Sequence, residues 1–162
     1  MSEQRLYQLA QETGAALMAR SYTLVTAESC TGGWIGAAVT MVAGSSEWYE
    51  RGYITYTTIA KCEMLAVSAQ TLESYGAVSD QTVREMVVGA LAASHAQVAV
   101  AVSGVAGPGG GTPAKPVGRV CLAWALKHGS VIAETRHFAG DRESVRRQTV
   151  ERSLEGVLSL IK

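Results

Sequence analysis

Ser29 lies in the stretch AESCTGGWIG, residues 27–36, where small hydroxyl-bearing residues and glycines separate two apolar segments. A helix is predicted to begin at Thr31, and the free N–H groups and dipole of a helix N-terminus stabilise nearby negative charge by roughly 0.3–1 kcal/mol. A serine at this point can act as a nucleophile whose developing oxyanion faces backbone donors. It can also simply cap the helix. Spacing alone leaves both interpretations open.

A serine nucleophile needs a base, and the histidines are poorly placed to supply one. His95, His128 and His137 fall at a predicted helix end, a hairpin turn and a strand, so a Ser-His-Asp triad is disfavoured. Lys61 begins the helix after the second predicted strand, and a lysine beside an apolar site loses its proton near neutral pH because desolvation disfavours the ammonium. Tyr56, at the end of that strand, has a hydroxyl able to relay protons. The competing interpretation is a solvated lysine and a core tyrosine.

The cysteines suggest neither a metal site nor a disulfide framework. Cys30 is an alternative nucleophile, but no histidine falls in the surrounding loops to activate it, which favours a buried structural thiol. Cys30, Cys62 and Cys121 are odd in number and show no CxxC spacing, which argues against disulfides and structural zinc. Since no cluster of His, Asp and Glu has metal-ligand spacing either, no metal is expected.

Two further segments have the composition of a binding site. The glycines of SGVAGPGGG, residues 103–111, let a ligand lie against bare backbone, although the segment matches neither a P-loop nor GxGxxG. Ser103 can donate a hydrogen bond to a ligand or satisfy its own strand end. In GDRESVRR, residues 140–147, Arg142 and Arg146 are four residues apart and share a helix face. Their two guanidinium groups suit a phosphate or carboxylate, and a solvated helix face is the alternative.

Alternating helices and strands must position these segments. Apolar periodicity predicts an order in which helices separate the first three strands, followed by a hairpin at KHG, residues 127–129. This order predicts an α/β fold with a mixed sheet covered by helices on both faces. The turns after the first three strands then meet at one edge of the sheet, where ligands collect. The predicted helices span 3–20, 31–42, 59–65, 68–75, 80–94 and 141–161, with Thr58 and Ser79 as N-caps, and the strands span 23–27, 52–56, 97–104, 119–126 and 130–138.

Length and charge narrow the class of protein. The 162 residues fit one domain, 1–162, and 48% hydrophobic residues suffice for a full core. The net charge is zero, with 14 basic and 14 acidic residues, which argues against a nucleic-acid surface. Neither a signal-peptide pattern nor an 18-residue apolar run is present, so we expect a cytoplasmic protein without a membrane span.

Six motifs in fixed order resemble the CinA C-terminal domain family. They are AESCTGG, GYITYTTIAK, GAVS, VSGVAGPGGG, KPVGRV and FAGDRESVR, and the resemblance covers about residues 6–160. The family's stand-alone members are nicotinamide-nucleotide amidases. The resemblance therefore implies a three-layer α/β/α sandwich with a mixed, mainly parallel sheet, and a short, amidase-only form of the protein.

The resemblance also assigns roles by position. It implies Ser29 as the nucleophile, with Tyr56 and Lys61 as its catalytic partners. Its motifs further imply a set of substrate-binding residues: Glu28, Thr31, Gly32, Gly33, Ser103, Gly104, Gly107 and Arg142. Two positions depart from the family pattern. Thr57 and Thr58 replace a frequent Ser-Asn after the tyrosine, and Arg119 stands where a smaller residue such as threonine is common.

The activity implied is hydrolysis of the carboxamide of nicotinamide mononucleotide to nicotinic acid mononucleotide and ammonia, a step of pyridine nucleotide recycling. It needs no metal or organic cofactor. The implied partners are the mononucleotide substrate and further copies of the chain in a homo-oligomer, without nucleic acid or membrane. Two alternatives stay open: a non-catalytic nucleotide-binding or regulatory module, and an amidase for another small amide.

Overall fold

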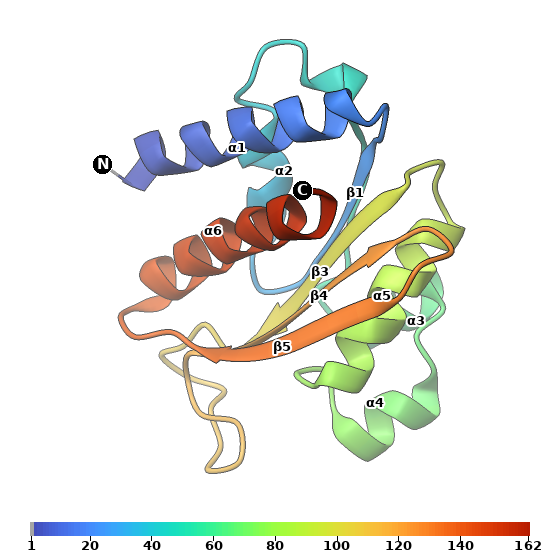
Figure 1. Ribbon diagram of the computed structural model, residues 1–162. Helices are drawn as coiled ribbons and strands as arrows, with labels where there is room; N and C mark the ends of the chain where they lie inside the picture. The colour runs from blue at the N-terminus through green and yellow to red at the C-terminus, as the bar shows by residue number, and fades with distance from the viewer. Residues whose placement is uncertain (1) are drawn as a thin grey trace.

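The computed structural model describes residues 2–162 and contains every predicted helix and strand in the predicted order (Figure 1). A short 3-10 helix is added before the second strand. The elements are α1 (Ser2–Ala19), β1 (Leu24–Glu28), α2 (Trp34–Val39), η1 (Ser45–Glu47), β2 (Tyr49–Ile54), α3 (Thr58–Leu65), α4 (Ala69–Tyr75), α5 (Asp80–Ala92), β3 (Val98–Gly104), β4 (Arg119–Leu126), β5 (Val131–His137) and α6 (Arg142–Ile161).

The five strands form one sheet in the order β2-β1-β3-β4-β5. β1 pairs in parallel with both β2 and β3, whereas β4 pairs antiparallel with β3 and β5. β4 therefore runs opposite to the other four strands. This arrangement confirms the predicted α/β class and the mixed, mainly parallel sheet.

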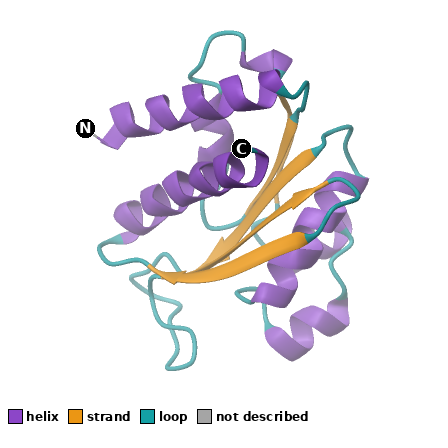
Figure 2. Cartoon of the chain, in the orientation of Figure 1, coloured by secondary structure: helices purple, strands orange, loops and turns teal. Residues whose placement is uncertain are grey.

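Helices cover both faces of the sheet, so the molecule has three layers (Figure 2). The central strand β3 shows why: its alternating valines and alanines point to opposite faces, and all are buried. The valines of β3 join a core with α1, α2 and α6. The alanines belong to a second core with α5 and the end of α3. Small alanine side chains on this second face let α5 pack close to the sheet.

Local capping sets most helix boundaries, with two corrections. Ser68, Ser79 and Asp141 cap α4, α5 and α6 with side-chain oxygens. At α3 the N-cap is Thr57 instead of the predicted Thr58, because the Thr57 hydroxyl accepts the Ala60 N–H at 3.2 Å. The second helix was expected over residues 31–42 but forms only between Trp34 and Val39, and its predicted first turn is an irregular loop instead.

The carboxyl ends of β1, β2 and β3 lie side by side because these strands are neighbours and parallel. Residues 29–33 follow β1, residues 55–57 follow β2, and the glycine loop, residues 105–118, follows β3. Three segments far apart in sequence thus meet at one edge of the sheet, as predicted. In the part of the chain that the structure describes, no helix has the length and apolar character needed to cross a membrane.

Candidate active site

A cavity of about 310 Å³ opens at the edge where these three segments meet. The nucleophile turn, residues 29–33, contributes Ser29 and Cys30 to its wall, and the start of α6 contributes Arg142. The connection between α4 and α5 contributes Ala77 and Val78, which the motif analysis did not single out as site residues. The complete lining is Ser29, Cys30, Tyr56, Lys61, Ala77, Val78, Ser103, Gly104, Val105, Ala106, Gly107, Gly109, Gly110 and Arg142.

Ser29 and Lys61 meet at the base of this cavity. The Lys61 Nζ lies 2.9 Å from the Ser29 Oγ, although the two residues are 32 positions apart in the sequence. The same amine lies 2.7 Å from the carbonyl oxygen of Thr55 and 3.4 Å from that of Tyr56. Lys61 reaches this position because α3 begins directly after β2 and turns its first-turn side chain back toward β1.

Burial changes the protonation of Lys61. Its side chain is only 1% exposed, and loss of solvation lowers the lysine pKa from 10.5 to about 8. No carboxylate within residues 2–162 forms an ion pair with this amine, and desolvation outweighs the smaller, opposing effect of the neighbouring Cys30 thiol on the lysine pKa. A substantial neutral fraction is therefore present near neutral pH, as a general base requires.

Glu28 organises the nucleophile turn from beneath. Its buried carboxylate accepts the Thr31 hydroxyl at 2.5 Å and the N–H groups of Ile35 and Gly36 at 2.9 and 3.0 Å. This carboxylate therefore occupies the N-terminus of α2 and delays the helix to Trp34. Glu28 and Thr31 lie outside the cavity wall and hold the turn in place, while their contact with substrate stays a prediction.

Two glycines give the nucleophile turn its shape. Gly32 and Gly33 have φ angles of 59° and 106°, in the region that L side chains rarely adopt. A Cβ at Gly33 would also lie 3.0 Å from the Ile54 side chain. Neither glycine lines the cavity, so the structure gives both a conformational role, and their contact with substrate stays a prediction.

Arg146 holds the same turn from the side of α6. Its Nε donates to the Cys30 carbonyl and its Nη2 to the Thr31 carbonyl, both at 3.0 Å. The guanidinium also lies 5.3 Å from the centre of a Trp34 ring. Arg146 donates to backbone oxygens of the turn, so its use with Arg142 as a pair for a phosphate or carboxylate stays a prediction that these contacts do not support. The spacing of four residues showed that Arg142 and Arg146 share a face but not what that face contacts.

Arg142 and Tyr56 form the outer wall of the cavity. Arg142 donates from Nη1 to the Gly107 carbonyl at 2.8 Å and from Nη2 to the Tyr56 hydroxyl at 3.1 Å. The Tyr56 side chain is 58% exposed. Its hydroxyl is thus bonded to Arg142, and the contacts of Tyr56 with Ser29 and Lys61 come from its backbone carbonyl. The structure therefore places Tyr56 in the site without bringing its hydroxyl to the serine.

The end of β3 and the glycine loop form the opposite wall. Ser103 is 1% exposed and lines the cavity beside Gly104 and Gly107. A Cβ at Gly104 would lie 2.6 Å from Val120, and one at Gly107 would lie 2.5 Å from Val117. These glycines are needed where the loop packs on its own return limb. The predicted loop residues and Ser103 are thus brought to the same cavity as Ser29.

Cys30 shares the cavity wall with Ser29 but has the opposite acid–base character. Burial raises the pKa of its thiol to about 12, so it stays protonated and is a weak nucleophile. This supports the structural interpretation of Cys30. Among residues 2–162, no group of three His, Cys, Asp or Glu side chains is arranged to hold a metal ion.

The model of the CinA C-terminal domain matches residues 6–161, nearly the whole chain. The chain belongs to the CinA C-terminal domain family. Its relatives include two proteins named nicotinamide-nucleotide amidohydrolase PncC. The one from Enterobacter agglomerans is 53% identical over 158 residues, covering 98% of this chain and 96% of the relative. The one from Pseudomonas putida is 54% identical and covers 94% of each chain.

Solved structures of this family have the same fold. A competence/damage inducible protein, CihA, from Agrobacterium tumefaciens superposes with a TM-score of 0.95 at 43% identity, over 98% of this chain and 96% of that one. A competence damage-inducible protein A from Klebsiella pneumoniae gives a TM-score of 0.92 at 40% identity, over 95% of each chain. The fold and the positions of the three site-forming segments are therefore those of the CinA C-terminal domain.

Proposed function

We propose that this protein hydrolyses the carboxamide of nicotinamide mononucleotide to nicotinic acid mononucleotide and ammonia, with Ser29 as nucleophile. The observation that carries the proposal is the 2.9 Å contact between the Ser29 hydroxyl and a buried lysine amine. Relatives at about half identity along their full length are named for this amidohydrolase activity. The geometry supports the assignment of Ser29 and Lys61 to this reaction.

The surroundings of Lys61 match the requirements of a neutral amine. Such an amine has two N–H donors and one lone pair. The carbonyls of Thr55 and Tyr56 can accept the two N–H groups, which leaves the lone pair for the Ser29 hydroxyl proton. Lys61 takes that proton as Ser29 attacks the carboxamide carbon, and a tetrahedral oxyanion forms.

The oxyanion is stabilised by the backbone of the nucleophile turn. The N–H groups of Gly32 and Trp34 already bond to carbonyls inside the turn, and those of Ile35 and Gly36 bond to Glu28. The Cys30 N–H, adjacent to the nucleophile and on the cavity wall, is the donor we assign. Removing one such donor in other enzymes slows catalysis by about 10²–10³-fold.

The remaining steps return the protein to its starting state. The C–N bond breaks as the proton held by Lys61 passes to the departing nitrogen, which gives ammonia and an ester between Ser29 and the nicotinoyl carbon. Water then adds to the ester carbon, Lys61 accepts one proton of that water, and cleavage of the C–O bond returns a proton to Ser29. The products are the carboxylic acid and the free serine, and the acid then gives its proton to Lys61, which releases it to solvent as the carboxylate leaves. The chain's own groups carry each proton, and the proposal includes no metal or organic cofactor.

The nucleotide phosphate is held at the outer end of the cavity. Arg142 lies there beside the backbone of Gly107, Gly109 and Gly110. A guanidinium and exposed amide groups together suit a phosphate. Val78 and the Tyr56 ring offer apolar surface for the pyridine ring.

The cellular setting is also part of the proposal. The expected location is the cytoplasm, and the expected assembly is a homo-oligomer that binds no nucleic acid. The exposed side chains of Ile54 and Ile59 beside the cavity mouth support contact with a second copy. Light scattering of the purified protein measures this directly, and a monomer at all concentrations would contradict the oligomer.

The decisive experiment incubates the purified protein with nicotinamide mononucleotide and follows ammonia and the acid product. The wild-type protein should release both in equal amounts. Ser29→Ala should bind the nucleotide but release neither, because the covalent route is closed. Full activity in Ser29→Ala would overturn the serine mechanism. An inactive wild type would favour a binding module, and a panel of other small amides would reveal a different substrate.

A further inference from the structure

A second cavity of about 350 Å³ adjoins the active-site cavity, with Val78 lining both. It is lined by Tyr75, Val78, Ser79, Asp80, Gln81, Lys115, Arg119 and Thr135. We propose that this cavity binds a small molecule through a phosphate or diphosphate group. The proposed reaction does not use it, and the motif analysis assigns it no role.

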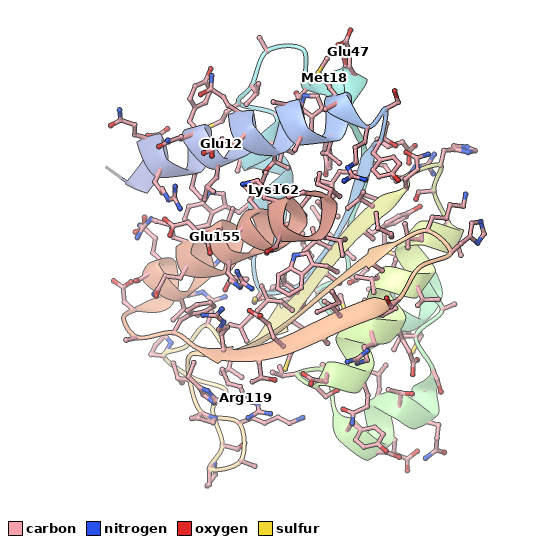
Figure 3. The ribbon with its side chains drawn as sticks, viewed as in Figure 1. Glu12, Met18, Glu47, Arg119, Glu155 and Lys162 are labelled. Carbon is pink, nitrogen blue, oxygen red and sulfur yellow. The ribbon has the colours of Figure 1, made fainter. Side chains whose placement is uncertain are left out.

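Arg119 is the central observation. It is the first residue of β4, at the end of the sheet from which the glycine loop extends, and Figure 3 labels it there. Its buried Nε has no hydrogen-bond partner within residues 2–162, and its guanidinium joins none of the ion pairs found in that range. Buried donors in native proteins are almost always satisfied, so an unpaired one indicates a missing partner. A guanidinium favours an oxyanion with two oxygens in reach of its fork.

Lys115 supplies a second positive charge to the same cavity. Its Nζ donates to the Tyr75 carbonyl at the end of α4, which brings the loop residue against the start of α5. An ammonium has three donors, so two remain for a ligand. Lys115, from a loop that is otherwise rich in glycine and proline, and Arg119, from the start of β4, thus line the cavity with two cations.

The N-terminus of α5 lines the wall opposite the loop. Ser79 caps this 13-residue helix by accepting the Thr82 N–H, and the N–H groups of Asp80 and Gln81, in the first turn, have no partner within the helix. Their partial positive charge adds to that of the two side chains. Tyr75, about half exposed, offers an aromatic surface for the organic part of a phosphorylated ligand.

Asp80 sets a limit on the affinity. Its carboxylate accepts the Thr135 hydroxyl at 2.9 Å and lines the cavity with one negative charge. The two cations exceed it by one charge, so a phosphate is attracted overall, but less than it would be without Asp80. Removing the Asp80 charge should therefore strengthen phosphate binding. Structural damage from a substitution would rarely have that effect.

The test titrates pyrophosphate into the full-length protein by calorimetry. We expect wild-type binding, a loss of at least about tenfold in affinity in Arg119→Ala, and a smaller loss in Lys115→Ala. Asp80→Asn, which retains the acceptor for Thr135, should bind more tightly than wild type. Arg136→Ala removes the same charge from the neighbouring strand, where Arg136 is bonded to Glu134, and should change affinity less than about twofold.

The Arg142→Ala variant distinguishes pyrophosphate binding in the proposed cavity from binding in the active site. If pyrophosphate binds the proposed site, its affinity is unchanged in Arg142→Ala, whatever happens to amidase activity. Loss of binding in Arg142→Ala with retention in Arg119→Ala would place the anion in the active site and overturn the proposal. So would equal effects of Arg119→Ala and Arg136→Ala, or no wild-type binding at about 10 mM. If Arg119→Ala fails to fold, Lys115→Ala, on an exposed loop, still tests the proposal.

Discussion

The nucleophile turn and the glycine loop face each other across one cavity but are built in opposite ways. The turn is fixed from three sides: by the Glu28 carboxylate, by the Arg146 guanidinium and by the amine of Lys61. The loop spans residues 105–118 and keeps its glycines at the cavity wall. Its attachments are few, chiefly the bonds between Val105 and its return limb and the contact from Arg142.

This difference separates the chemical step from substrate binding. A nucleophile and its base must be held within a fraction of an ångström, so contacts that fix the turn act on kcat. A loop of bare backbone adapts to a ligand and acts on KM. Substitutions that loosen the nucleophile turn should therefore mainly lower kcat. Substitutions on the glycine-loop side should mainly raise KM.

Lys61→Met should give the largest effect. It retains most of the buried side-chain volume but removes the lone pair that accepts the Ser29 proton. We expect kcat to fall at least about 10³-fold while the nucleotide still binds. Steady-state kinetics with an ammonia readout, beside equilibrium binding, measures both. Activity within about tenfold of wild type would mean that another group is the base.

Arg142→Ala should mainly raise KM. Loss of a charged hydrogen-bond donor to the phosphate raises KM by about 10–100-fold, with kcat little changed. The control is the corresponding nucleoside, which has no phosphate and should be processed equally by both proteins. A fall in kcat without a change in KM would remove Arg142 from the binding side.

The pH dependence should report the buried amine. The active form is the neutral lysine, whose pKa is about 8, so kcat/KM should rise about tenfold per pH unit below 8 and level off above it. The free energy of unfolding should rise between pH 8 and about 10.5, because there the unfolded chain still binds the proton that the folded chain has released. A profile without an inflection near 8 would contradict Lys61 as the base.

Arg146→Ala and Arg147→Ala form a matched pair. Both arginines lie against Trp34, but Arg146 holds the turn carbonyls, whereas Arg147 pairs with Glu143 on the surface. Arg146→Ala should lower kcat by about tenfold with little change in KM, and Arg147→Ala should leave both nearly unchanged. Equal effects of the two substitutions on kcat would show that contact with Trp34 matters more than the hydrogen bonds from Arg146 to the turn carbonyls.

Two glycine substitutions give the smallest effects, measured as stability. Gly33→Ala places a side chain at a φ of 106° and against Ile54, which should cost about 1–2 kcal/mol of unfolding free energy. Gly109→Ala meets nothing within 4 Å and should change stability by less than about 0.5 kcal/mol. Denaturant unfolding compares the two. A larger loss in Gly109→Ala would show that the loop is the more constrained segment.

The sequence predicted the elements well because strong local signals mark them. The apolar run of β3 and the predicted cap Ser79 are each readable within a few positions. The strand order predicted that the segments containing Ser29 and Lys61 share a sheet edge, since parallel neighbours end together. The 2.9 Å contact between the Lys61 amine and the Ser29 hydroxyl depends on how α3 packs back toward β1. No local sequence pattern predicts that packing.

The errors arose where a distant group competes with a local preference. The second helix was predicted to begin at Thr31, but the Glu28 carboxylate takes the amides of Ile35 and Gly36 instead. For Arg146, spacing indicated the helix face shared with Arg142 but could not indicate its bonds to carbonyls 115 and 116 positions away. Arg119 stood out in the sequence without an explanation, and the cavity beside it supplies one.

The proposed role of Lys61 as the base affects product departure, because its amine would then lie close to the reacting carbon. Hydrolysis of an uncharged carboxamide creates a carboxylate a few ångströms from this nitrogen. An anion there favours the ammonium form, since opposite charges in a poorly solvated space attract strongly. The newly formed acid therefore leaves most readily once the lysine is again uncharged, which links release of the nicotinate to loss of a proton from the enzyme.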